Sequence, residues 1–307
     1  PAVRACSGAR ATAVAAALFA FACESSTAPG WPVSLRIAPD SAVLLEFDTV
    51  MLRAVLLDSS SREIDGRAVA WVSTDTTVAL VLGDGRVVGD RVGEATVYAA
   101  SEGLYAPARI RIVVRPVEAS VGRDPCIITT RGSVYCGTAR LVRIPGPRAL
   151  TRISRGESHV CALDSAGGGW CWGSNGSGQL GDGTTISTDT PEAVQGGARF
   201  LQIRAGAYHT CGLTRENQVL CWGANTWGQL GTGDLTNRPT PTPVVGGGQW
   251  VAVSAGSEHT CALRKDGEAW CWGDASLGRL GNGVYRGQTS VPTAVLAKTA
   301  GRGEFVV

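Results

Sequence analysis

The sequence predicts an all-β protein in which a β-sandwich is followed by a partial β-propeller of about four blades. The 307 residues include 41 glycines, a composition typical of short strands joined by tight turns. Residues 33–116 alternate apolar and polar side chains in short runs. The rest of the chain repeats one motif at a fixed interval without helical periodicity, which favours propeller blades.

Composition and charge narrow the classes of function. Hydrophobic residues make up 44% and charged residues 18% of the chain, as in globular rather than disordered proteins. The formal net charge is +2 and no dense run of lysine or arginine occurs. We therefore expect no nucleic-acid partner.

The N-terminal residues have the pattern of an export signal. Arg4 and Arg10 accompany an apolar stretch over residues 11–23, which is too short to span a bilayer as a mature helix. We expect a signal peptide over residues 1–23 and a flexible linker over 24–32.

The residues before Cys23 resemble a bacterial lipobox, which makes Cys23 the candidate lipidation site. Cleavage after Ala22 without lipidation is the alternative. Either route predicts an exported protein of the cell envelope or the extracellular space. In the lipidated case it would be an outer-membrane lipoprotein, and the lipid anchor would be its only contact with the membrane.

Residues 33–116 contain about seven short apolar–polar runs separated by turn signals, the pattern of a β-sandwich. Trp71 lies in an apolar run and is expected in the core. "VAWVSTDTTVALV" and "DGRVVGDRVGEATVYA" resemble the bacterial immunoglobulin-like group 2 family. The resemblance implies an immunoglobulin-like sandwich that serves as a spacer or adhesion module and carries no catalytic residues.

Residues 120–307 repeat one unit. In three copies a histidine precedes the first of two cysteines, and Trp-Gly and a glycine-rich loop follow the second. The final segment matches the opening of another inner strand, so further C-terminal blades are expected. The copies span 148–198, 199–248 and 249–301, with a divergent copy at 120–147 and the start of a further blade at 302–307.

The glycine-rich loop reads Gly-Gln-Leu-Gly at 178–181 and 228–231, and Gly-Arg-Leu-Gly at 278–281. Together with the Trp-Gly pairs it resembles the repeat of the regulator of chromosome condensation family. That resemblance implies a propeller, and eukaryotic relatives catalyse guanine nucleotide exchange on a small GTPase. An exported chain would not meet that cytosolic partner, so exchange activity is not expected.

Eight of the 10 cysteines form four equally spaced pairs, one pair in each unit. Asp266-Gly267 is a hairpin signal that would bring the flanking cysteines opposite each other. We expect disulfides within each unit, because export leads to an oxidising compartment. Buried free thiols are the alternative, and the spacing is wider than zinc sites prefer. The expected bonds are Cys126–Cys136, Cys161–Cys171, Cys211–Cys221 and Cys261–Cys271.

The three histidines of the chain occupy the same position in successive units. We expect each to bond a neighbouring backbone group and lock blade to blade, and the tryptophans to pack between blades. Metal binding or catalysis is the alternative, but no metal or cofactor is expected, and the loops "GDGT" and "GTGD" offer few carboxylates for calcium. These structural residues are His159, His209, His259, Trp172, Trp222 and Trp272.

The motifs predict a binding protein rather than an enzyme, since no Ser-His-acid set or phosphate-binding loop occurs. The loops on one propeller face would contact a protein or glycan ligand. Inhibition of a secreted enzyme, or a non-catalytic role within a larger extracellular enzyme, are the alternatives. The candidate contact residues are Asn175, Tyr208, Asn225, Trp227 and Tyr285.

Overall fold

The computed structural model describes residues 31–121, 124–138, 141–147 and 149–296. Its contacts divide the chain into the units Pro1–Arg115 and Pro116–Val307. The expected signal peptide, the expected lipidation site Cys23 and the expected further blade at 302–307 lie outside the described residues. Among the described residues, no helix has both the length and the apolar character that crossing a membrane requires.

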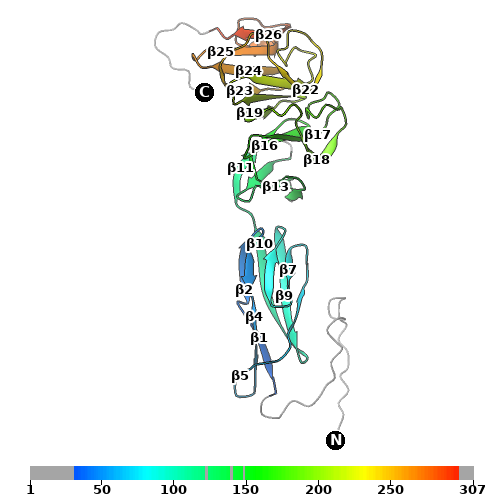
Figure 1. The fold of residues 1–307 in the computed structure, drawn as a ribbon, viewed down its shortest axis with the longest axis vertical. Coiled ribbons are helices and arrows are strands. Elements are labelled where there is room, and N and C mark those ends of the chain that lie inside the picture. The colour runs from blue at the N-terminus through cyan, green and yellow to red at the C-terminus, as the bar shows by residue number, and fades with distance from the viewer. Residues whose placement is uncertain (1–30, 122–123, 139–140, 148, 297–307) are drawn as a thin grey trace. The chain divides into compact units, whose positions relative to one another are not determined.

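The first unit is a sandwich of antiparallel and mixed sheets (Figure 1). Its four-stranded sheet has the order β2-β10-β9-β6, and two three-stranded sheets have the orders β1-β4-β5 and β3-β8-β7. The strands are β1 (Ser34–Ala38), β2 (Ser41–Leu45), β3 (Thr49–Met51), β4 (Arg53–Leu57), β5 (Glu63–Ile64), β6 (Ala70–Ser73), β7 (Ala79–Val81), β8 (Arg86–Gly89), β9 (Gly93–Ser101) and β10 (Leu104–Val113).

Strand β10 shows why this segment builds a sandwich. Its residues alternate between buried and exposed, so that Ala108 and Ile110 enter a core shared with Leu35 of β1. Glu102 and Gly103, both at positive φ, form the tight turn between β9 and β10. Trp71, which we expected in the core, is only partly buried and packs against the buried core residues from outside.

The second unit consists of four antiparallel four-stranded sheets that follow one another along the chain, coloured green to red in Figure 1. These are blades 1 to 4, so the predicted all-β fold with a partial propeller is confirmed. The first blade begins at Pro116, before the expected start of the repeats at 120. The strands are β11 (Pro116–Ser120), β12 (Cys126–Thr129), β13 (Val134–Cys136) and β14 (Val142–Ile144) in blade 1; β15 (Leu150–Arg155), β16 (His159–Asp164), β17 (Gly169–Gly173) and β18 (Thr188–Ala193) in blade 2; β19 (Phe200–Ala205), β20 (His209–Thr214), β21 (Val219–Gly223) and β22 (Arg238–Pro243) in blade 3; and β23 (Trp250–Ala255), β24 (His259–Arg264), β25 (Ala269–Asp274) and β26 (Gln288–Ala294) in blade 4.

The turn between the second and third strands of a blade has the same conformation in blades 2, 3 and 4. Its positive-φ position is held by Gly167, Asn217 and Gly267, residue types that adopt the left-handed region at low cost. In blade 4 the Asp266 side chain also accepts a hydrogen bond from the Glu268 backbone N–H, at 3.0 Å. Local sequence therefore determines where each blade reverses direction.

Candidate interaction surface of the propeller

Each blade contains one disulfide, between its second and third strands. The two cysteines lie directly opposite each other in the strand register, with Cα atoms 4.1 Å apart in all four blades. The bonds are Cys126–Cys136, Cys161–Cys171, Cys211–Cys221 and Cys261–Cys271.

The disulfides of blades 2 and 3 face the next blade. Cys161 and Cys171 lie in one buried cluster with Trp222 and Phe200 of blade 3, whose rings are 5.8 Å apart. Trp272 occupies the corresponding place against the disulfide of blade 3, and Trp172 packs with Cys126 of blade 1. Each of these blade boundaries is therefore a hydrophobic core in which one tryptophan packs with at least one cysteine of the preceding blade.

A polar relay crosses the same boundaries. His159 Nε2 lies 2.8 Å from the Thr210 hydroxyl of the next blade, and that hydroxyl donates to the Gln179 carbonyl at 2.8 Å. The Trp222 indole N–H donates to the same carbonyl at 3.0 Å. The histidine thus bonds a threonine side chain, and the backbone group that we expected as its partner is one hydrogen bond further along.

The relay determines the histidine tautomer. Because the single hydroxyl proton of Thr210 is donated to Gln179, the hydroxyl can only accept from His159, so Nε2 carries the proton. His209, Thr260, Gln229 and Trp272 repeat the arrangement between blades 3 and 4.

Burial keeps these histidines neutral. Loss of hydration, followed by the positive charge of Arg155, lowers the pKa of His159 to about 4. Burial lowers the pKa of His209 to about 3, with smaller contributions from the other two histidines. In both histidines the neutral imidazole uses its Nε2–H inside a blade boundary.

Blade 1 has no histidine, and blade 2 correspondingly lacks the threonine that would bond to it. Val160 takes the place that Thr210 and Thr260 hold in blades 3 and 4, and it is buried against blade 1. The hydroxyl is present where the preceding blade supplies a histidine, and an apolar side chain replaces it where the preceding blade does not.

Asn175 and Asn225, which we expected on the contact face, are fully buried, so this assignment is wrong. The Asn175 side chain accepts from the Leu180 backbone N–H at 3.0 Å and donates to the Asp182 carboxylate and the Ile186 carbonyl. Asn225 accepts from the Leu230 N–H and donates to the Thr236 carbonyl in the same way, with the Thr232 hydroxyl in place of the Asp182 carboxylate. Each amide holds a long loop closed and is inaccessible to a ligand.

The corresponding loop of blade 4 is built differently. Ala275 stands where blades 2 and 3 have the buried asparagine. The Arg279 guanidinium instead bonds the Asp274 carboxylate at 3.0 Å, and Asp274 accepts from the Ser276 backbone N–H at 2.9 Å. Blade 4 therefore presents a distinct loop built on a charged pair.

The long loops lie at one end of the blades. Adjacent strands run antiparallel, so the connection between strands one and two and the connection between strands three and four share one end. Between neighbouring blades, the Ala207 N–H bonds Ser257 O at 3.3 Å and joins two of these connections, and the Gly233 N–H bonds Ser290 O of strand β26 at 2.9 Å. We call this end, formed by residues 156–158, 174–187, 206–208, 224–237, 256–258 and 275–287, the loop end.

Large hydrophobic side chains are exposed at the loop end. Tyr208, Trp227 and Tyr285, which we expected there, are 45%, 39% and 70% exposed. Sequence reasoning missed four others: Ile186, Leu235, Leu277 and Val284. In the repeat, Leu277 aligns with Trp227 and Leu235 with Tyr285, so the sequence carried a signal for these two, whereas Ile186 and Val284 align with polar residues. The turns at the opposite end are largely polar, with Arg215, Glu216, Lys265 and Asp266 among their residues.

The described residues contain no group of three or more His, Cys, Asp or Glu side chains placed to hold a metal ion. His159 and His209 are engaged in the relay. Asp234 forms an ion pair with Arg238 at 2.6 Å.

Comparison with known families identifies both units. The bacterial Ig-like domain (group 2) matches residues 33–103. The regulator of chromosome condensation (RCC1) repeat matches residues 167–213 and 216–263, and a second description of this repeat matches 200–229 and 250–279. No curated protein matches the chain significantly.

Solved structures share the fold at low sequence identity. Human WBSCR16 has a TM-score of 0.55 at 19% identity, over 69% of this chain and 67% of that protein. Yeast RCC1 (Prp20) bound to Kap60 has a TM-score of 0.54 at 18% identity, over 82% of this chain and 74% of that one. Prp20p from Saccharomyces cerevisiae, studied for its binding to Gsp1p and histones, gives 0.53 at 18% identity, over 82% and 76%. The chain therefore combines a bacterial Ig-like domain of group 2 with regulator of chromosome condensation repeats folded as propeller blades.

Proposed function

We propose that the chain is an exported cell-surface binding protein that recognises a protein partner through the loop end of its propeller. The observation that carries this proposal is the gathering of seven exposed hydrophobic side chains at that end: Ile186, Tyr208, Trp227, Leu235, Leu277, Val284 and Tyr285. Hydrophobic residues of this size on a soluble surface are typical of interaction sites. The related yeast RCC1 (Prp20) is a protein that binds Kap60.

The centre of the surface lies at the boundary of blades 3 and 4. A Cβ atom at Gly228 would come within 2.7 Å of the Ser290 backbone, so the backbone next to Trp227 lies against strand β26. In blade 4 the Tyr285 ring covers Gly278, beside Leu277. Tryptophan and tyrosine supply most of the binding energy in many interfaces, which makes Trp227 and Tyr285 the expected anchors.

Photo-crosslinking tests the location of the surface. The complete protein, expressed in its host, would carry a photoreactive phenylalanine analogue at position 227, 285 or, as a control at the opposite end, 265. We expect the same partner adduct from positions 227 and 285 and none from 265. Equal adducts from all three positions, or none from any, would contradict the proposal.

Affinity for the crosslinked partner provides a second test. Trp227→Ser should weaken binding by about 2 kcal/mol or more, whereas Leu201→Ser, which removes an exposed hydrophobic side chain at the start of β19, beside the turn at the opposite end, should leave it unchanged. Equal losses in the two variants would place the interface elsewhere.

Export and anchoring belong to the same proposal. The Ig-like domain and the four disulfides are consistent with an extracellular protein. If Cys23 carries the lipid, Cys23→Ala should move the protein from the membrane fraction to the soluble fraction. Unchanged fractionation would remove the lipid anchor from the proposal and leave binding by the propeller untouched.

A further inference from the structure

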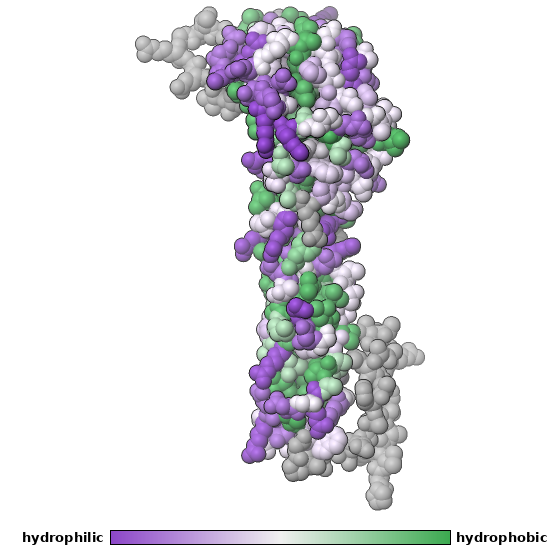
Figure 2. All heavy atoms as spheres, in the orientation of Figure 1, coloured by the Kyte–Doolittle hydropathy of each residue, from purple (hydrophilic) through white to green (hydrophobic). Residues whose placement is uncertain are grey.

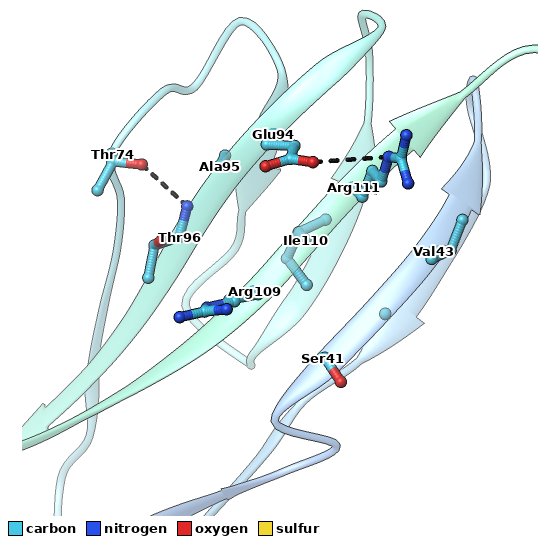
Figure 3. Close-up of a pocket in the computed structure, with 10 residues that line it drawn as sticks. Ser41, Val43, Thr74, Glu94, Ala95, Thr96, Arg109, Ile110 and Arg111 are labelled. Atoms are coloured by element: carbon cyan, nitrogen blue, oxygen red, sulfur yellow. Dashed lines mark hydrogen bonds and ion pairs between the residues drawn. The ribbon is translucent and has the colours of Figure 1, made fainter.

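We propose that the outer face of the sheet β2-β10-β9-β6 in the Ig-like unit binds an acidic polysaccharide, and that Arg109 contacts its carboxylate or sulfate groups. The site is separate from the loop end of the propeller. It is the shallow hollow drawn in Figure 3, which is lined by side chains from β2, β9 and β10 and by Thr74.

Strand register places one cation in a row with hydroxyl groups. Arg109 lies opposite Ser41 on β2 and opposite Thr96 on β9. The Thr96 backbone N–H donates to the Thr74 hydroxyl at 2.9 Å. That hydroxyl accepts this bond and keeps its own proton available to donate outward. Arg109 and two threonine hydroxyls are therefore available as donors on one line across the sheet.

The neighbouring charges leave Arg109 available. Arg111, one row further along β10, pairs with Glu94 at 3.6 Å (Figure 3). Ser41 donates to Asp40 at 3.3 Å, so the serine can only accept from a ligand. Within the described part of the chain, the Arg109 guanidinium forms no ion pair. Its planar fork suits a carboxylate or a sulfate group.

Flat side chains beside the cation favour a saccharide over an acidic protein segment. Pro107 lies opposite Tyr98 in the row next to Arg109, and Tyr105 follows on the same face with 71% exposure. Tyr105 lies about 13 Å from Arg109 along the strand. Exposed tyrosine rings offer an apolar face and a polar hydroxyl, which matches a sugar ring carrying a charged group. The open face can accommodate successive residues of a chain.

Biolayer interferometry with the complete protein tests the site. The immobilised probes are polygalacturonate for carboxylate, dextran sulfate for sulfate ester, unmodified dextran for a neutral chain and polyglutamate for an acidic polypeptide. We expect binding to polygalacturonate, to dextran sulfate or to both, and no binding to dextran. The stronger of the two polyanions identifies the anion.

Single variants then distinguish the site from general charge attraction. Arg109→Gln should raise the apparent Kd about tenfold, and Tyr105→Ala should raise it about fivefold. Arg36→Gln removes the same charge from an exposed position on β1, in another sheet, and should leave the Kd unchanged. Thermal unfolding verifies that each variant is folded.

Three results would overturn the inference: no binding to either polyanionic polysaccharide, equal weakening by Arg36→Gln and Arg109→Gln, or polyglutamate binding that is as tight as polysaccharide binding and insensitive to Tyr105→Ala. None of them bears on the loop end of the propeller, which these variants leave intact.

Discussion

His159 in blade 2 and Thr210 in blade 3 are joined by a 2.8 Å hydrogen bond inside a boundary that is otherwise hydrophobic. The threonine and Trp222 of the same blade both donate to the Gln179 carbonyl of blade 2. Two blades that contact each other mainly through apolar surface could slide relative to each other. A buried hydrogen-bond chain with fixed donors and acceptors selects one alignment, because misalignment leaves its polar groups unpaired.

Replacing Thr210 with valine tests this relationship. The change keeps the side-chain shape but leaves the buried His159 Nε2–H without an acceptor, so we expect a loss of about 2 kcal/mol in the free energy of unfolding. Urea denaturation followed by tryptophan fluorescence measures it. Thr185→Val, on an exposed loop, is the control and should change the free energy little. Equal stability of the two variants would show that the relay contributes nothing.

The relay also predicts loss of stability in mild acid. Burial lowers the folded-state pKa of His159 to about 4 and of His209 to about 3, from the usual 6.5. Below pH 6.5 the unfolded chain therefore binds protons that the folded chain does not, and stability falls as the pH falls towards these values. Between pH 7 and pH 5 we expect a loss of about 2 kcal/mol for each histidine.

A substitution isolates the histidine contribution to this pH dependence. His209→Gln retains a side-chain N–H for Thr260 but cannot gain a proton. Its unfolding free energy should therefore fall by about 2 kcal/mol less than that of the wild type over the same pH interval. Chemical denaturation at pH 5, 6 and 7 measures both curves. Parallel curves for the two proteins would assign the acid sensitivity to other groups.

The disulfides stabilise individual blades, so removing one should act locally. The double variant Cys211→Ala/Cys221→Ala opens a short closed loop, with an expected cost of about 3 kcal/mol on the chain-entropy argument. Hydrogen exchange should increase most in strands β20 and β21, while the sheets of the Ig-like unit serve as the internal control. A uniform increase over both units would contradict blade-local stabilisation, and non-reducing peptide mapping that found bonds between blades would contradict the pairing.

The repeat explains how much of the fold could be predicted from the sequence. Three copies of one motif place the histidines, cysteines and Trp-Gly pairs at equivalent positions, and periodicity alone predicts blades. The sequence could also have predicted that the partner of the histidine is a threonine. The residue before the first cysteine is Thr210 or Thr260 where the preceding copy has a histidine, and Val160 where it has none.

The loop end was harder to predict, because repetition does not separate buried residues from exposed ones there. Asn175 and Tyr285 both lie in polar, glycine-rich loops, yet the first is fully buried and the second largely exposed. The difference arises because the loop folds back over the amide of Asn175, an arrangement of loop conformation that neither composition nor spacing reveals. Ala275 in blade 4 was the available signal that the asparagine has a specific role in the other blades.

Asn175→Ala gives blade 2 the residue that blade 4 has at this position. The Leu180 N–H and the Ile186 carbonyl would each lose a buried partner, because blade 2 lacks the Arg279–Asp274 pair that supports the loop in blade 4. We expect a loss of about 2 kcal/mol in stability and faster proteolysis within residues 176–187. Limited proteolysis with mass spectrometry locates the cleavage, and Asn282→Ala, which removes an asparagine amide that is only partly buried in blade 4, is the matched control. If residues 176–187 remained as resistant as in the wild type, the buried amide would not be what holds this loop closed.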